Sequence, residues 1–301
     1  MNYVLNREID PSVVRHRIGA LALAAVTLVV AGHCNQSESN NDAETLALVA
    51  LASAPVSMPF SLVADNQSVG CNQNFTIGTG NDTVQIKDFR VYLSEFAWIT
   101  PDGEVSVTLP DLGDWQKNNA VLIDLEDGTG YCSGTGTTAT NGQITLPAPP
   151  SNATGLAFSI GLPDSVNRLN NTTTSAPFNI SQMYWTWANG YKFANVELSQ
   201  NGTTAYRFHL GSIGCTGTPG EAYTSCSRPM KGRVQLNNVN VANGIQFDVK
   251  DWFSGQAYAV TDCMGAPTPD ARCQALRNRM GLDQTSGQPS TGNAIGFELK
   301  Q

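Results

Sequence analysis

Histidine is scarce in this sequence of 301 residues. Only three histidines occur, and His209 is the only one beyond the first 34 residues. Several enzyme motifs are missing as well, because no carboxylate pair, glycine-rich phosphate loop or Ser/His/Asp order stands out. With one histidine, a hydrolytic triad would need a serine and an aspartate partner, and no spacing in the sequence identifies such a pair. The sequence therefore predicts a protein that is not an enzyme.

Helical periodicity is also nearly absent, and only residues 271–280 predict a short helix, tied down by Cys273. Apolar residues instead alternate at period two, which is typical of half-buried strands. This alternation is clearest at Val105–Leu109, Val121–Leu125 and Leu156–Ile160. The longer run Val84–Ile99 shifts phase, as a β-bulge would cause. Many short strands between turns predict an all-β fold, a disulfide-stabilised antiparallel β-sandwich with long loops.

The first 34 residues have the layout of a secretory signal peptide. Three arginines precede an apolar run over residues 18–32, which is too short for a comfortable membrane span and lacks a stop-transfer pattern. Cys34 follows where a bacterial lipoprotein carries its acylated cysteine, although His33 replaces the usual small residue. Lipid anchoring to the outer membrane, plain cleavage and an uncleaved anchor are the alternatives. We expect an exported protein in the periplasm or at the cell surface of a Gram-negative bacterium.

The rest of the chain divides into a tether and one domain. Residues 35–55 are rich in Ser, Asn and Ala and predict a flexible linker, whereas residues 56–301 contain no clear internal linker. The net charge is −8, and the leader contributes three Arg against Glu8 and Asp10, or +1, so the remainder carries −9. An acidic surface disfavours nucleic acid and anionic lipid as partners. We expect no nucleic-acid partner.

Seven cysteines occur, and six remain when Cys34 is set aside. An even number in an exported chain predicts three disulfides. No Cys-x-x-Cys is present, so a thioredoxin-like or zinc-knuckle function has no support. Counting alone does not fix the connectivity. Two pairs are close enough in sequence to close small loops, which would leave a third: Cys215 with Cys226, Cys263 with Cys273, and Cys71 with Cys132.

The most informative stretch is Met183-Tyr-Trp-Thr-Trp-Ala-Asn-Gly-Tyr-Lys-Phe193. Its Asn-Gly pair predicts a type I′ hairpin, because that turn needs positive φ at both central residues. A second Asn-Gly pair, at residues 201–202, predicts another reversal before His209. Two-residue loops at both turns would place Trp185 opposite Ala194, and Ala194 opposite His209.

Side chains alternate between the two faces of a strand. Trp185, Trp187 and His209 would therefore share one face, with only the methyl group of Ala194 between Trp185 and His209. Two other interpretations stay open. Tryptophan pairs in strands often simply pack, and a lone histidine is often only hydrogen-bonded. A β-bulge in either strand would move these side chains to opposite faces.

These motifs resemble those of a known family, the MbnP-like proteins. They are the four-Cys proteins of metallo-mystery pair systems and are found beside di-haem cytochrome c peroxidases. The resemblance covers nearly all of residues 58–230. The motifs that carry it are Val69-Gly-Cys71, Ile86-Lys-Asp-Phe-Arg-Val-Tyr92, Leu122-Ile-Asp-Leu-Glu126, Phe158-Ser-Ile-Gly-Leu-Pro163, Met183-Tyr-Trp-Thr-Trp187, Gly190-Tyr-Lys-Phe193 and Phe208-His-Leu-Gly-Ser-Ile-Gly-Cys215.

The resemblance implies an exported β-sandwich associated with copper, with a di-haem cytochrome c peroxidase-like protein as its partner. In such proteins the partner oxidises a tryptophan to kynurenine, which holds the metal together with an imidazole nitrogen. Carried over, Trp185 and Trp187 are candidates for oxidation, and Trp185 and His209 for metal binding. The four-Cys motif falls on Cys71, Cys132, Cys215 and Cys226, and the other two cysteines are an addition.

One departure bears on the metal. The chain has Asn167-Arg168 where the family commonly shows Asn-His, and arginine keeps its proton and cannot ligate copper. Cu(I) tolerates two or three soft or imidazole ligands, so we expect Met183 or an aromatic-derived ligand to complete the site. We therefore expect an exported, non-catalytic copper-binding protein. The alternative is a metal-free recognition or structural β-sandwich that uses the Trp185/Trp187 face.

Overall fold

The structure is a computed structural model that describes residues 54–186, 189–217, 221, 223–258, 261–264, 270–283, 285–290 and 294–300. The expected signal peptide with Cys34 lies outside these residues, as do Trp187 and all but the last two residues of the expected linker. Across the part of the chain that is described, no helix is long and apolar enough to cross a membrane.

The elements are mostly strands. They are β1 (Val56–Ala64), β2 (Gln67–Ser68), β3 (Phe75–Ile77), β4 (Asp82–Thr100), β5 (Gly103–Ser106), β6 (Gln116–Lys117), β7 (Ala120–Asp124), β8 (Gln143–Leu146), β9 (Gly155–Ile160), β10 (Tyr184–Thr186), β11 (Gly190–Tyr191), β12 (Ala194–Gln200), β13 (Thr203–Leu210), β14 (Ile213–Thr216), β15 (Ser225–Arg228), β16 (Gly232–Asn237), β17 (Ile245–Asp248), β18 (Thr261–Met264) and β19 (Phe297–Leu299). The helical segments are η1 (Gly130–Cys132), α2 (Asp164–Asn167), η2 (Ser181–Met183), α3 (Val249–Trp252) and α4 (Ala271–Asn278).

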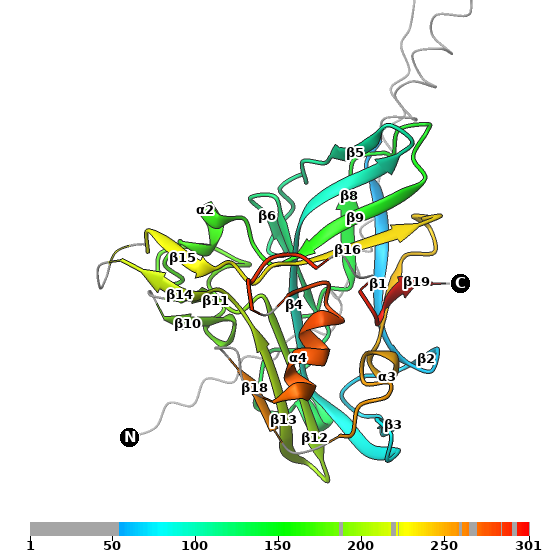
Figure 1. The fold of residues 1–301 in the computed structure, drawn as a ribbon, viewed down its shortest axis with the longest axis vertical. Helices are drawn as coiled ribbons and strands as arrows, with labels where there is room; N and C mark the ends of the chain where they lie inside the picture. Colours follow the sequence, from blue (N-terminus) through cyan, green and yellow to red (C-terminus); the bar gives the residue numbers. More distant parts are fainter. Residues whose placement is uncertain are drawn as a thin grey trace, which may run out of the picture. The chain divides into compact units, whose positions relative to one another are not determined.

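Two sheets build the domain (Figure 1). The larger sheet runs β16-β9-β4-β12-β13-β18, with β3, β5 and β7 also paired to β4 and β6 paired to β7. The smaller sheet runs β19-β17-β1-β2, with β8 against β1, while β10-β11 and β14-β15 are separate hairpins. The pairs β1·β17 and β13·β18 are parallel and the remaining pairs antiparallel. The expected all-β class is confirmed.

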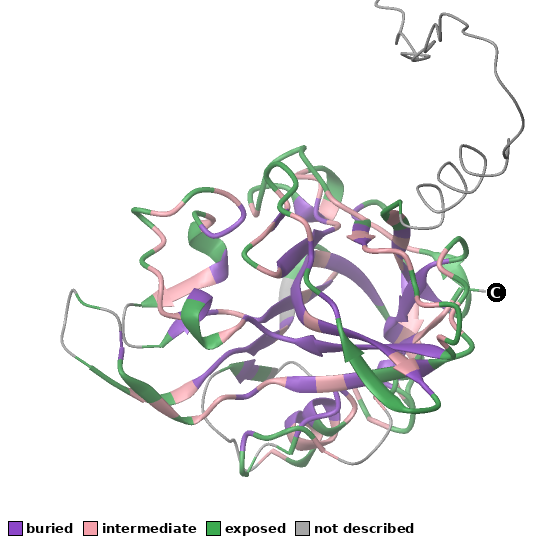
Figure 2. Ribbon diagram, turned by 90° about the horizontal axis from the view of Figure 1, so that it is seen from above, coloured by how far each residue is buried: buried purple, intermediate pink, exposed green. Residues whose placement is uncertain are grey.

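Aromatic side chains join the two sheets into a sandwich. Phe89 on the large sheet lies 6.3 Å from Phe60 and 5.5 Å from Phe247, both on the small sheet, measured between ring centroids. Phe158 and Phe297 meet across the same interface at 5.7 Å. Figure 2 shows that buried residues are concentrated in the central strands. The period-two alternation of the sequence thus supplies the apolar face on which each sheet packs.

The long strand β4 bends where the sequence pattern shifts phase. Its register with β9 breaks between Ser94 and Ala97, and Glu95 within this interval has φ 52°. An extra residue there turns the following side chains to the other face. The predicted bulge is confirmed, as is the short helix, which is α4 and contains Cys273.

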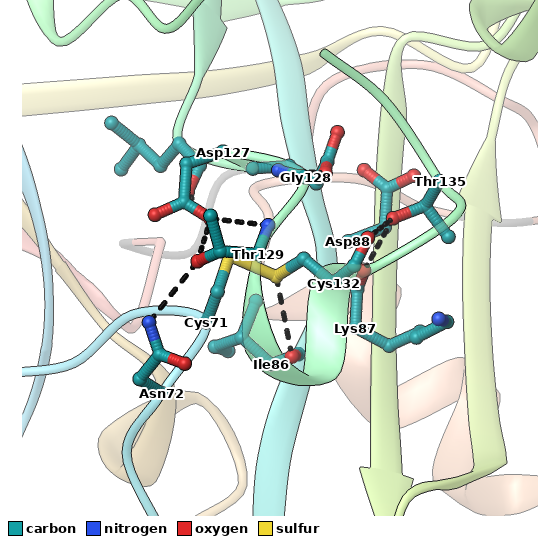
Figure 3. Close-up of a disulfide and its surroundings, with 12 residues drawn as sticks. Cys71, Asn72, Ile86, Lys87, Asp88, Asp127, Gly128, Thr129, Cys132 and Thr135 are labelled. Atoms are coloured by element: carbon teal, nitrogen blue, oxygen red, sulfur yellow. Dashed lines mark hydrogen bonds between the residues drawn. A yellow bond between two sulfur atoms is a disulfide. The ribbon is translucent and has the colours of Figure 1, made fainter. Parts of the chain in front are cut away.

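All three disulfides form with the pairing that the short loops suggested. Cys71–Cys132 ties the loop after β7 to the segment between β2 and β3, and its Cα atoms are 5.3 Å apart (Figure 3). Beside it, Asn72 Nδ2 donates a hydrogen bond to Thr129 Oγ1 at 3.1 Å, and the Tyr131 amide donates to the Cys71 carbonyl at 2.9 Å. These contacts fix a loop that covers the large sheet.

The predicted hairpin registers are wrong. In the first hairpin, Tyr184 lies opposite Tyr191, and Ala194 is paired on its two sides with Val91 and Leu210, which excludes Trp185 from that position. In the second, the turn forms as expected.

A β-bulge then follows this second turn. The register of β12 with β13 shifts between Leu198 and Ser199, so that Asn195 rather than Ala194 lies opposite His209. One extra residue in β13 is the physical reason for the error.

Two disulfides that close loops of very different length give a test of the chain-entropy contribution. Replacing Cys71 and Cys132 by Ser should lower the free energy of unfolding more than replacing Cys215 and Cys226, because the sequence separations are 61 and 11 residues. Loop-closure entropy predicts a difference of about 1.5 kcal/mol between the two double variants. Urea unfolding measures it, and an equal or reversed ranking would contradict this account.

Candidate functional site

A cavity of about 710 Å³ opens beside the hairpin β10-β11, next to β13, β14 and β18. Aromatic, apolar and polar side chains together line its wall. The lining residues are Tyr184, Trp185, Thr186, Asn189, Lys192, His209, Ser212, Ile213 and Met264. The solitary histidine of the described chain thus faces the same space as the tryptophan of the hairpin.

His209 is 5% exposed and has one hydrogen-bond partner. Its Nε2 lies 2.8 Å from Oε1 of Glu197, which sits on the same face of the sheet on β12. An ionised carboxylate only accepts hydrogen bonds, so Nε2 carries the proton and Nδ1 carries the lone pair. Nδ1 is buried and has no hydrogen-bond partner. The imidazole therefore has one nitrogen whose lone pair is not used by a hydrogen bond within the protein.

Burial and nearby charges hold this protonation state. Burial lowers the pKa of His209 below its ordinary value, the hydrogen bond to Glu197 opposes that effect, and the positive charge of Lys192 adds to it. Although burial alone would raise the pKa of Glu197, the hydrogen bond from His209 brings it below the ordinary value. Neutral imidazole and ionised carboxylate are therefore the stable pair at neutral pH.

Trp185 packs against the backbone that follows His209. A Cβ atom on Gly211 would lie 2.5 Å from Trp185 Cζ3 and 2.6 Å from the Tyr191 carbonyl oxygen, so only glycine fits between them. This contact explains the glycine of the His-Leu-Gly motif. Trp185 and His209 line one cavity, although the row across Ala194 that the sequence predicted does not exist.

The two methionines of interest lie in different places. Met183, the expected additional ligand, is fully buried in the core and does not line the cavity. Met264 on β18 does line it, opposite His209 in the parallel pairing of β13 and β18. Sequence reasoning missed Met264 because no local signal announces that pairing. It missed Glu197 because only the bulge brings this residue to the face of His209.

Arg168, which stands where the resemblance predicts a histidine, is not among the lining residues of the cavity. The Arg168 guanidinium lies 5.6 Å from the centre of the Tyr223 ring and 3.8 Å from Asp164. Its neighbour Asn167 is buried, donates to Ser212 Oγ at 3.0 Å and accepts from the Tyr191 amide at 2.9 Å. Asn167 thus holds the hairpin against the cavity wall.

A buried ionic cluster continues the face on which His209 lies. Arg90 donates to both carboxylate oxygens of Asp88, and Asn195 Nδ2 donates to Asp88 Oδ2 at 2.7 Å. Burial raises the pKa of Asp88 to about 6, and it raises the pKa of Asp124 to about 7, both against opposing interactions with Arg90. A single guanidinium thus serves several carboxylates beneath the site.

Two groups of three ligand-type residues occur among the described residues, and in each group some of the ligand atoms are already engaged. Cys71, Cys132 and Asp127 lie together, but the two sulfurs are joined in a disulfide. In the group of Asp248, Asp251 and Glu298, Asp248 caps α3 by accepting from two backbone amides. Neither group therefore offers three free ligand atoms.

The fold and the site define a three-disulfide all-β sandwich with an imidazole and an indole along one cavity. The chain belongs to the MbnP family, which it matches over residues 53–268. Its structure is similar to that of MbnP from Methylosinus trichosporium, with 26% sequence identity and a TM-score of 0.65. That similarity covers 83% of this chain and 99% of the other. No curated protein matches the chain.

The contact of Trp185 with Gly211 gives a prediction. Gly211→Ala should cost about 1–3 kcal/mol of stability through overpacking and should change the near-ultraviolet circular dichroism of the tryptophans. Gly70→Ala is the matched control, because its Cβ would meet only the flexible Gln73 side chain, at 3.3 Å. Similar effects of the two substitutions would show that Trp185 does not rest on Gly211.

The buried carboxylates predict a pH dependence of stability. The folded pKa values of Asp88 and Asp124 are about 6 and about 7, above the ordinary 3.8, so the native state holds protons that the unfolded chain releases. Their contribution is fully present below about pH 4 and is lost as the pH rises through both folded values.

Asp88→Asn should therefore flatten the decline of unfolding free energy between about pH 4 and pH 6. Urea unfolding at several pH values measures the slope. Asp102→Asn in an exposed turn is the control and should leave the slope as in wild type. A slope that Asp88→Asn leaves unchanged would contradict the assignment.

Proposed function

We propose that this protein is an exported, non-catalytic accessory protein that binds Cu(I) in the cavity of His209 and Trp185. The observation that carries the proposal is the buried, unpartnered Nδ1 of His209. A metal-ligating histidine usually donates its other N–H to a carboxylate or carbonyl, which fixes the tautomer and raises the basicity of the ligand. Glu197 is placed to do this.

The residues of the cavity fit copper. A neutral imidazole nitrogen and soft or aromatic-derived groups suit Cu(I). Among the described residues that line the cavity there is no carboxylate, the ligand that a hard cation would prefer. His209 Nδ1 would hold the metal, and Glu197 would orient the ring. Bound copper would supply a soft, redox-active cation to the cavity. Burial lowers the pKa of His209, so protons compete with the metal at lower pH than they would at an exposed imidazole.

We also propose that Trp185 is the tryptophan oxidised by a partner di-haem cytochrome c peroxidase-like protein. Trp185 is partly exposed and lines the cavity, so an oxidant reaches its indole. Opening of the pyrrole ring inserts two oxygen atoms across the C2–C3 bond, and hydrolysis then releases one carbon as formate. The partner supplies the oxidant. The resulting aromatic amine would be a nitrogen donor in the space that His209 also faces.

Copper binding is tested by thermal unfolding with and without Cu(I). Wild type should gain stability, His209→Gln should gain none, and Glu197→Gln should bind about 10–100-fold more weakly, as expected for an outer-shell partner. Asp262→Asn, on an exposed position of β18 outside the cavity lining, is the control. Equal shifts for wild type and His209→Gln would refute the proposed site.

The oxidation of Trp185 is tested by mass spectrometry of protein from cells that make the partner. Conversion of one tryptophan to kynurenine adds about 4 Da, and peptide mapping should place this covalent change at Trp185. Trp185→Phe should abolish it. An unmodified mass in the presence of the partner, or a modification placed at Trp187 alone, would contradict the assignment.

One observation favours a second function. The cavity of about 710 Å³ is larger than a single ion needs, and Tyr184, Trp185 and Ile213 give it an apolar wall. A metal-free recognition module would use such a surface for a partner or a carbohydrate. Protein that carries no copper after growth with excess metal, and that Cu(I) does not stabilise, would favour this function.

A further inference from the structure

Met264 lines the cavity and is far more exposed than the other described methionines. It is 39% exposed at the cavity wall, whereas Met58, Met183, Met230 and Met280 are each at most 1% exposed. Among the described residues, it is therefore the methionine whose thioether an ion entering the cavity can reach. A thioether is also a soft ligand of the kind that Cu(I) prefers.

The pairing of β13 with β18 sets the direction of this side chain. The strands are parallel, with Arg207 opposite Asp262 and His209 opposite Met264. An ion pair of 3.2 Å joins Arg207 and Asp262, which shows that they share a face. Because side chains alternate along a strand, Met264 shares the face of His209, with the two backbones about 4.8 Å apart. Both residues line the cavity.

A disulfide holds β18 in this position. Cys263 alternates to the opposite, core-facing side, is fully buried, and is bonded to Cys273 on α4. Tyr206 Oη donates a hydrogen bond to Cys263 Sγ at 3.1 Å. This short strand at the edge of the large sheet is therefore fixed on the core side, and its next residue is presented to the cavity.

We propose that Met264 is a ligand that joins His209 in the site and makes it selective for monovalent over divalent copper. This inference rests on the proposed copper function. His209 is the only imidazole among the described residues, so a further soft donor in the cavity has to be another side chain, and the Met264 thioether lines the same wall. A nitrogen and a sulfur donor together suit Cu(I), whereas Cu(II) prefers nitrogen and oxygen ligands.

The affinity test compares two methionines. Competition with a chromophoric Cu(I) chelator should show Met264→Leu weakened by at least about tenfold, since loss of a ligand costs no less than loss of an outer-shell partner. Met183→Leu is the matched control, because a Met-to-Leu exchange in the core conserves volume. It should bind as wild type. Equal affinities of Met264→Leu and wild type would overturn the proposal.

A second readout reports on the sulfur itself. Peroxide converts an exposed methionine to its sulfoxide, and a metal bound to the thioether blocks the lone pair that is oxidised. Ag(I) is the probe, since it is soft, monovalent and does not cycle with peroxide. Peptide mapping should show that Ag(I) slows sulfoxide formation at Met264 in wild type and not in His209→Gln. Unchanged oxidation of Met264 in the presence of Ag(I) would also overturn the proposal.

The two proposals fail in different ways. If wild type binds Cu(I) through His209 and Met264→Leu binds it equally well, the copper function stands and the thioether ligand is wrong. If wild type binds no Cu(I), both are wrong. Weak binding by Met183→Leu together with full binding by Met264→Leu would assign the sulfur to the core methionine and refute the role of Met264.

Discussion

The register of β13 is the constraint on which the candidate site depends. This strand lies between β12 and β18, and a bulge near its start sets which of its residues face the cavity. With the bulge, His209 lies opposite Asn195 and reaches Glu197 at 2.8 Å on the same face. Without it, every side chain beyond the turn would change face. The hydrogen bond that fixes the imidazole tautomer therefore follows from one extra residue in a strand.

The groups around His209 keep its proton on Nε2 and its lone pair on Nδ1. Burial disfavours the imidazolium, and Glu197 accepts the N–H that remains. Arg90 and Asp88 form a separate pair on the same face, so the carboxylate of Glu197 is left to the histidine. Removing a buried carboxylate from such a set leaves its partner unsatisfied, which costs more than the pair itself contributes.

Much of the fold could be predicted from the sequence, because period-two alternation and turn residues are local signals. They predicted β7, β9, the bulge in β4 and helix α4, and the short cysteine spacings indicated the disulfides. The site was harder. The Asn-Gly pair at residues 201–202 correctly predicted a two-residue turn. No local pattern indicated the bulge beside it, so His209 was expected opposite Ala194 instead of Asn195. Met264 and Glu197 join the site through pairing between strands, which a single sequence does not encode locally.

His209 is the only histidine beyond residue 34, so in a chain without residues 1–34 its imidazole nitrogens give one pair of signals in a long-range ¹H–¹⁵N spectrum. Such a spectrum, recorded before and after addition of Cu(I), tests the central claim most directly. We expect the neutral Nε2–H tautomer without metal, and a shift on Cu(I) addition that is largest at Nδ1. A proton on Nδ1 in the metal-free protein, or a Cu(I)-induced shift confined to Nε2, would contradict the account.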